Sequence, residues 1–195
     1  MGRLQLDRDF VLYWSSRYLD EMTPVERERE AHLFDVTARS VQTHGFFNRD
    51  QFLEVGRWKA VRATGPMKAN SDGRVQDITA LALSATNCER ASTLTSLAGV
   101  GLPMASALLT VWQPANYTVY DVRAQQSLVR FGYGKKAYRW SFGLYLATCR
   151  DIASGLDLPT QVPPLRQLDR ALWKHDQVHS GSEPQPADPG PTLVA

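Results

Sequence analysis

Cysteine is scarce in this chain, and long hydrophobic runs are absent. Its 195 residues include two cysteines, Cys88 and Cys149. Two thiols exclude a four-thiolate iron–sulfur cluster or zinc site built within the chain, argue against a disulfide scaffold, and fit a reducing cytoplasm. No apolar run approaches the ~20 residues that span a bilayer, and the residues from Met1 to Asp9 contain no hydrophobic segment of a signal peptide. We therefore expect a cytoplasmic protein without a membrane partner.

Metal-binding patterns are equally sparse. The four histidines, His32, His44, His175 and His179, do not form an HExxH motif. His175 and His179 are four residues apart and could form a metal pair, but their position near a polar tail favours two solvated side chains. We expect no metal and no cofactor.

Positive charge is concentrated in two stretches, although the net charge is only +2. Residues 56–74 contain five basic residues and one acid, and so do residues 121–140. No lysine or arginine follows Lys174. Basic patches of this kind suit a polyanion such as nucleic acid, and an ordinary solvated surface is an equal alternative.

Hydrophobic periodicity is helical through most of the chain. Thr23-Pro24-Val25-Glu26 forms a capping box with proline at the first helical position, and it opens a long helix that Gly45 ends. Asn48 and Ser71 are predicted to cap the next two helices. Later helices are expected through Leu94 and Leu97, from Pro103 to Trp112, from Asp121, over residues 136–154, and from Pro164.

Strand patterns are weak, and residues 117–120 are interpreted as a short extended link. The predicted fold class is all-α, a compact multi-helix domain over residues 1–178. Residues 179–195 are rich in Pro, Gly and Ser, which predicts a disordered tail.

The most informative segment reads Leu-Ala-Gly-Val-Gly at residues 97–101. One helix is expected to end there and another to begin near Pro103, because two glycines permit positive φ and a close approach to a partner. Val100 is expected to point inward. The N–H groups after the turn would face outward at the positive end of a helix, which binds phosphate without a side chain.

This segment resembles the helix-hairpin-helix (HhH-GPD) superfamily of DNA glycosylases. Members share the pattern L-x-G-V-G-x-x-x-A, then an apolar helix, then a Pro-containing loop that ends in an essential aspartate. Here Ala105 completes the hairpin pattern, Pro114 lies in the loop, and Asp121 stands 20 residues after Gly101. The match covers residues 94–130. Without cluster cysteines or room for an extra β-domain, the chain is similar to a compact prokaryotic member without an iron–sulfur cluster.

The resemblance implies that Asp121 is the catalytic residue. Hydrolysis of an N-glycosidic bond develops positive charge on the sugar, and a nearby carboxylate stabilises that charge and orients the attacking water. The helix dipole favours the carboxylate form. A plain helix cap is the alternative interpretation of Asp121. Bifunctional members carry a lysine two residues after the second hairpin glycine, where this chain has Pro103, so no lyase activity is expected.

Other residues are assigned to the site by their position. The predicted DNA contacts are Gly99, Val100, Gly101, Leu102, Ser106, Arg57, Lys59 and Arg123. The predicted base pocket comprises Trp58, Trp112, Tyr117 and Tyr120. Core packing is the alternative for Trp58 and Trp112, and a surface ion pair is the alternative for Arg123. The alternating acids and arginines of residues 26–30 are interpreted as a solvated helix face.

The predicted function is therefore a monofunctional DNA glycosylase that acts as a monomer on double-stranded DNA. It would flip a modified or damaged base and leave an abasic site. Glucosylated hydroxymethylcytosine in phage DNA is one candidate base, which would make the protein a bacterial antiviral enzyme. The alternatives are a non-enzymatic helix-hairpin-helix DNA-binding module, in which Asp121 is only a cap, and a helical protein–protein adaptor.

Overall fold

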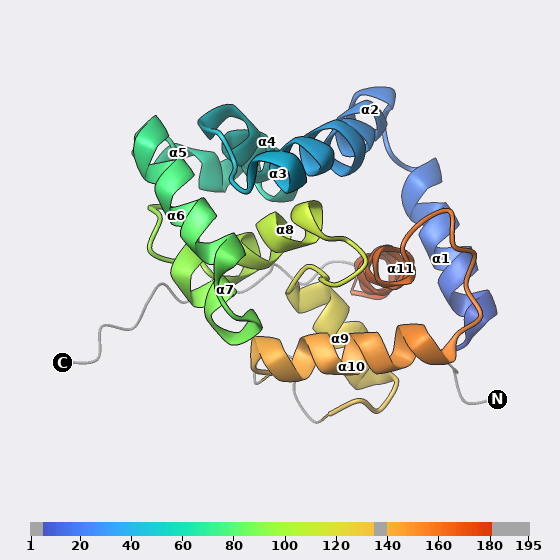
Figure 1. Ribbon diagram of the computed structural model, residues 1–195. Coiled ribbons are helices and arrows are strands. Elements are labelled where there is room, and N and C mark those ends of the chain that lie inside the picture. Colours follow the sequence, from blue (N-terminus) through green and yellow to red (C-terminus); the bar gives the residue numbers. More distant parts are fainter. Residues whose placement is uncertain (1–5, 135–139, 181–195) are drawn as a thin grey trace.

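The computed structural model describes residues 6–134 and 140–180. All regular secondary structure in these residues is helical, which confirms the predicted all-α fold (Figure 1). The helices are α1 (Arg8–Asp20), α2 (Pro24–His32), α3 (Ala38–His44), α4 (Arg49–Lys59), α5 (Thr64–Met67), α6 (Asp72–Ser84), α7 (Asn87–Leu94), α8 (Leu102–Trp112), α9 (Val122–Arg130), α10 (Phe142–Gly155) and α11 (Pro164–His179). None of these helices has the length and apolar character needed to cross a membrane.

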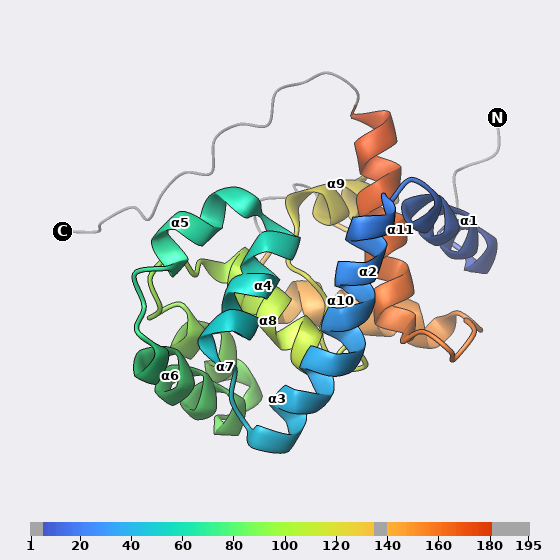
Figure 2. The same cartoon turned by 90° about the horizontal axis from the view of Figure 1, so that it is seen from above.

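Local capping chemistry sets several helix starts as predicted. Thr23 and Asn48 each form a complete capping box, and the side chain of Ser71 accepts a hydrogen bond from the backbone of α6. A π turn over Leu33–Thr37 joins α2 to α3, so residues 24–44 form one continuous helix (Figure 2). Gly45 ends that helix with a φ of 77°.

Several helix predictions differ from the structure, and the helix expected through Leu94 and Leu97 ends at Leu94. Helix α1 was not predicted, although Asp7 caps it and an apolar side chain, Val11, lies on its buried face. Helix α10 begins at Phe142 rather than at residue 136, because the side chain of Ser141 caps its first turn. Helix α11 continues through His179, and residues 181–195 of the predicted tail lie outside the described residues.

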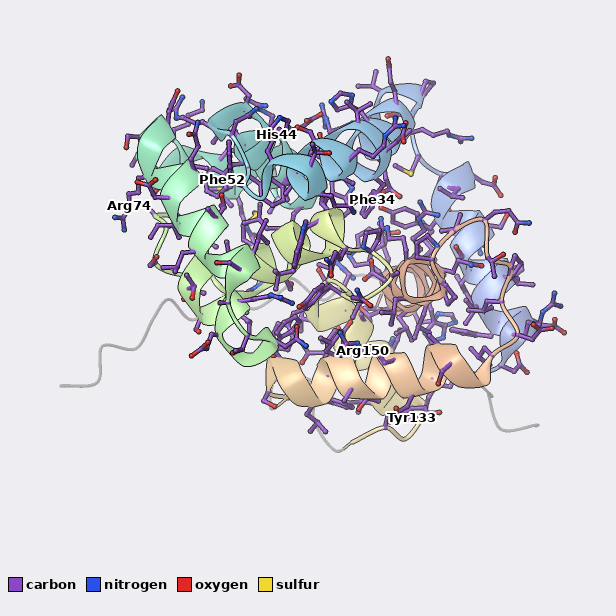
Figure 3. The ribbon with its side chains drawn as sticks, viewed as in Figure 1. Phe34, His44, Phe52, Arg74, Tyr133 and Arg150 are labelled. Carbon is purple, nitrogen blue, oxygen red and sulfur yellow. The ribbon has the colours of Figure 1, made fainter. Side chains whose placement is uncertain are left out.

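The buried apolar side chains form two clusters. The first contains side chains from all the helices between α3 and α8 in the sequence. Helix α8 is its centre, because every residue from Met104 to Trp112 is buried. Figure 1 shows α8 between the α3–α4 layer and α10. Phe52 points into this cluster, whereas Arg74 extends outward at its edge (Figure 3). The second cluster joins α1, α9, α10 and α11, and α1 packs along α11. Elements of both clusters therefore meet around the segment that leads into α9.

Candidate active site

A cavity of about 470 Å³ is lined by elements of both clusters. Its walls come from the end of α1, from α2, from the last turn of α4 and from α11. Val119 and Asp121, immediately before α9, complete the wall. The residues that enclose this space are therefore separated by as many as 159 positions along the chain, from Tyr18 to Gln177. Its volume is in the range of small-molecule sites.

Asp121 lies on the cavity wall with both carboxylate oxygens engaged. One oxygen accepts a hydrogen bond from the backbone N–H of Arg123 at 2.8 Å, so Asp121 is the N-cap of α9 as predicted. The other oxygen accepts a hydrogen bond from the ammonium of Lys59, the last residue of α4. The Asp121 side chain is 12% exposed. Its carboxylate is therefore fixed in orientation yet faces a space that a ligand can enter.

Ser106 connects Asp121 to the glycine turn. Its hydroxyl accepts a hydrogen bond from the backbone N–H of Tyr120 and donates one to the carbonyl of Pro103, both at 2.8 Å. Five residues separate Ser106 from Gly101, which is about 7 Å along a helix axis. The residue before Asp121, Tyr120, is therefore hydrogen-bonded to the first turns of α8. Ser106 itself is fully buried, so its prediction as a DNA contact is wrong.

The glycine turn has only part of the geometry that the sequence predicts, because Gly101 has a φ of −86° and does not use the positive region. Gly99 has a φ of 76°, and a Cβ atom there would lie 2.7 Å from the backbone nitrogen of Met67. Val100 is 5% exposed, so it is buried as expected, and the prediction of its side chain as a DNA contact is wrong. The N–H groups of Gly101 and Leu102 donate to no acceptor in the part of the chain that the structure describes. The start of α8 therefore has two backbone donors without a partner in these residues.

Asn70 holds this turn in place. The side chain is 2% exposed, and its amide nitrogen donates to the carbonyls of Met67 and Ala98 at 2.9 Å. Its amide oxygen accepts a hydrogen bond from the N–H of Ala98, also at 2.9 Å. Asn70 therefore holds the end of α5 and the glycine turn next to each other.

The two basic stretches behave differently. Arg57, Arg62 and Lys68 in the first stretch are exposed, and their side chains have no hydrogen bond or ion pair within residues 6–134 and 140–180. In the second stretch, Arg123 and Arg130 both pair with Asp176, at 3.3 Å and 2.6 Å. The alternative interpretation of Arg123 as an ion pair is therefore correct, and its prediction as a DNA contact is not supported. Lys135, Lys136 and Arg139 lie outside the described residues.

The predicted base pocket is only partly correct. Trp58 lines the cavity and packs edge-on against Phe34. Trp112 and Tyr117 stack on each other inside the first core cluster and are 8% and 1% exposed, so they do not reach the cavity. The hydroxyl of Tyr120 donates to the backbone carbonyl of Trp140, and its ring is not on the cavity wall either.

Two aromatic residues of the cavity were not predicted, Tyr18 on α1 and Trp173 on α11. Tyr18 belongs to a helix that sequence reasoning missed. Trp173 is partly exposed on the cavity wall. Their positions depend on how α1 and α11 pack together, and the two rings are 5.8 Å apart.

A buried charge network centred on Glu30 lies behind the cavity wall, to which its partners Arg166 and Arg170 belong. Glu30 is 3% exposed, so its prediction as part of a solvated face is wrong. Its carboxylate accepts hydrogen bonds from Arg166 at 2.8 Å and from Nε of Arg170 at 3.0 Å. It also accepts hydrogen bonds from the Tyr18 hydroxyl at 3.0 Å and from Nε1 of Trp58 at 3.2 Å. Burial raises the pKa of Glu30, but the two guanidinium groups outweigh burial and lower it to about 2.

Asp169 is a second carboxyl group on the cavity wall. It forms an ion pair with Arg166, one turn earlier on α11, and its side chain is 5% exposed. Burial raises the pKa of Asp169, while the charges of Arg166 and Lys59 lower it and the charge of Asp121 raises it. Burial is the largest of these effects, so the pKa of Asp169 lies above its usual value. The sequence does contain a pattern that could have predicted this wall. Arg166, Asp169 and Arg170 are spaced so that they share one face of α11.

His175 lies outside this site and differs from its prediction. It is 2% exposed rather than solvated, and its ring nitrogen shares a hydrogen bond with the Ser127 hydroxyl at 2.9 Å. Burial lowers the pKa of His175 to about 4. Within residues 6–134 and 140–180, no group of three or more His, Cys, Asp or Glu side chains is arranged to hold a metal ion.

Comparison with protein-family models, with curated proteins and with solved structures finds no match for this chain. The resemblance to helix-hairpin-helix DNA glycosylases therefore rests on the sequence of residues 94–130 alone.

Proposed function

We propose that this protein is a monofunctional DNA glycosylase. One observation carries the proposal: the carboxylate of Asp121 is held on the wall of a 470 Å³ cavity, and the preceding residue is tied to the first turns of α8, where a glycine turn presents free N–H groups. A phosphate held by the turn and a base held by the cavity would place the sugar of one nucleotide beside Asp121.

The reaction in this arrangement is hydrolysis of the bond between the sugar C1′ and the base nitrogen. As that bond lengthens, positive charge develops at C1′, and the nearby carboxylate stabilises it. Water adds to C1′, the base leaves with the bonding electrons and gains a proton, and an abasic sugar remains. The Arg123 N–H and the Lys59 ammonium keep the carboxylate in one orientation, so little reorganisation is needed during the reaction.

The DNA affinity would come from the surface beside the cavity. Arg57, Arg62 and Lys68 are free to contact phosphates, and the glycine turn supplies backbone donors. Three phosphate contacts made by side chains give a slope of about −3 in a plot of log affinity against log salt concentration.

The cavity wall also bears on the class of base. Trp58, Tyr18 and Trp173 offer aromatic surfaces, and the arginines and acids of α11 offer donors and acceptors. Such a wall fits a base that carries a polar substituent better than a small unmodified base. A modified cytosine such as glucosylated hydroxymethylcytosine in phage DNA belongs to this class, and the protein would then act in antiviral defence.

A panel of substrates tests the proposal. Duplexes with alkylated, oxidised and deaminated bases, and both unmodified and glucosylated phage genomes, are incubated with the protein and then treated with alkali. We expect alkali-dependent strand breaks with at least one modified substrate and none with Asp121→Asn. Breaks before alkali would contradict the monofunctional assignment. Salt-dependent binding without breaks on any substrate would favour the non-enzymatic binding module.

A further inference from the structure

Val61 is an apolar side chain in an unexpected place. It is 69% exposed, more than any other large apolar side chain within residues 6–134 and 140–180. It also borders the cavity that contains Asp121, two residues after Lys59. An isolated exposed valine is ordinary on a protein surface, but one at the mouth of a candidate base pocket has a specific use.

The backbone holds Val61 firmly. It begins a 3₁₀ turn over Val61–Ala63, directly after α4. The N–H of Ala60 donates to the carbonyl of Gly56 at 2.8 Å, and the N–H of Ala63 donates to the carbonyl of Ala60 at 2.9 Å. The hydroxyl of Thr64 donates to the carbonyl of Val61 at 2.6 Å. The side chain therefore projects from a fixed turn.

The surroundings of Val61 indicate what it faces. Arg57 and Arg62 lie on either side of it in the sequence, and both are exposed cations whose side chains bind no other group in the described part of the chain. Helix α5 follows within the same segment and packs against Gly99 of the glycine turn, because Met67 occupies the space that a Cβ atom at Gly99 would need. The glycine turn, α5 and the turn of Val61 therefore form one surface beside the cavity, on which Arg57, Arg62 and Lys68 are exposed cations.

We propose that Val61 is the wedge that enters the DNA base stack when the target nucleotide moves into the cavity. The occupant of this surface is duplex DNA, because a cationic surface around a single apolar projection matches phosphates around a gap between bases. The inference builds on the proposed function. Val61 fills the space that the extruded base leaves, and this lowers the cost of the extruded state. Burying a valine side chain there contributes about tenfold in affinity.

The test measures DNA binding and does not require excision. The probe is a fluorescent duplex with one tetrahydrofuran abasic-site analogue, which has a gap in one strand's base stack, and the same duplex fully paired is its control. Dissociation constants are measured by anisotropy for the wild type, Val61→Ser and Leu144→Ser. Leu144 is 58% exposed on α10 and serves as the matched control. Circular dichroism verifies that all three proteins fold alike.

We expect the wild type and Leu144→Ser to prefer the abasic duplex by about tenfold or more, and Val61→Ser to lose that preference while it binds the paired duplex as before. A preference retained in Val61→Ser overturns the proposal, and so does a wild type without any preference. Excision that does not depend on Val61 would refute the wedge and leave the glycosylase function intact. A Val61-dependent preference without excision on any substrate would support the wedge and refute the glycosylase.

Discussion

Replacing Glu30 with glutamine removes the central anion of the buried network behind the cavity. The carboxylate satisfies Arg166 and Arg170, whose side chains are 4% and 11% exposed. Removing one partner from a buried ion pair leaves the other charge uncompensated and costs about 3–5 kcal/mol of unfolding free energy. The pKa of Glu30 gives a comparable figure, because a fall from 4.5 to about 2 corresponds to ~3 kcal/mol.

Urea unfolding at pH 7, followed by circular dichroism, measures this cost. Glu30→Gln should lower the free energy of unfolding by about 3 kcal/mol or more. Glu28→Gln, an exposed carboxylate on the same helix, is the matched control and should change it by less than about 0.5 kcal/mol.

The pH dependence gives a second readout for the same group. Because the folded-state pKa of Glu30 is depressed, its contribution is present above pH 4.5 and is lost as the pH falls toward 2. Glu30→Gln should lack this part of the acid sensitivity. A loss below about 1 kcal/mol at pH 7, or an unchanged acid profile, would refute the account of Glu30 as the anion that holds the α11 arginines.

Two further predictions concern His175 and the glycine turn. The folded-state pKa of His175 is depressed to about 4, so its stabilising contribution is present above pH 6.5 and is lost as the pH falls toward 4. The loss of unfolding free energy over that interval is on the order of 2–3 kcal/mol. In His175→Phe the melting temperature should therefore depend less on pH between 6.5 and 4. Equal pH slopes in both proteins would contradict this assignment. Gly99→Ala should destabilise the fold by about 1–2 kcal/mol and weaken DNA binding, since φ is positive and the Met67 backbone occupies the Cβ position. Gly143→Ala, which meets no atom within 4 Å, should be neutral or stabilising in the same melts, and an equally stable Gly99→Ala would show that the turn tolerates a side chain.

Local patterns predicted four helix starts and the positive φ of Gly99 correctly. Thr23, Asn48, Ser71 and Asp121 all cap the helices expected, because a cap is decided by a few neighbouring residues. The positive φ of Gly99 was predicted for the same reason, because it depends only on the residues of the turn.

Side-chain environments were predicted less well, because they depend on helices far away in the sequence. Glu30 looks solvated within its own helix and is buried only because α11 brings Arg166 and Arg170 against it. Arg123 likewise meets Asp176 of α11, and Ser106 is covered by the segment that returns to Asp121. Lys59 was predicted to contact DNA, and no pattern along the chain places it beside Asp121.

The most direct measurement of the central claim is single-turnover excision by Asp121→Asn, compared with the wild type on the same modified duplex. Asparagine keeps the size and the capping oxygen of Asp121 but removes the charge that faces the reacting sugar. We expect Asp121→Asn to excise the base more slowly by a factor of about 10³ or more, with a similar affinity for the duplex. A variant that excises the base at the wild-type rate would mean that Asp121 only caps α9, and the catalytic role assigned to it would be wrong.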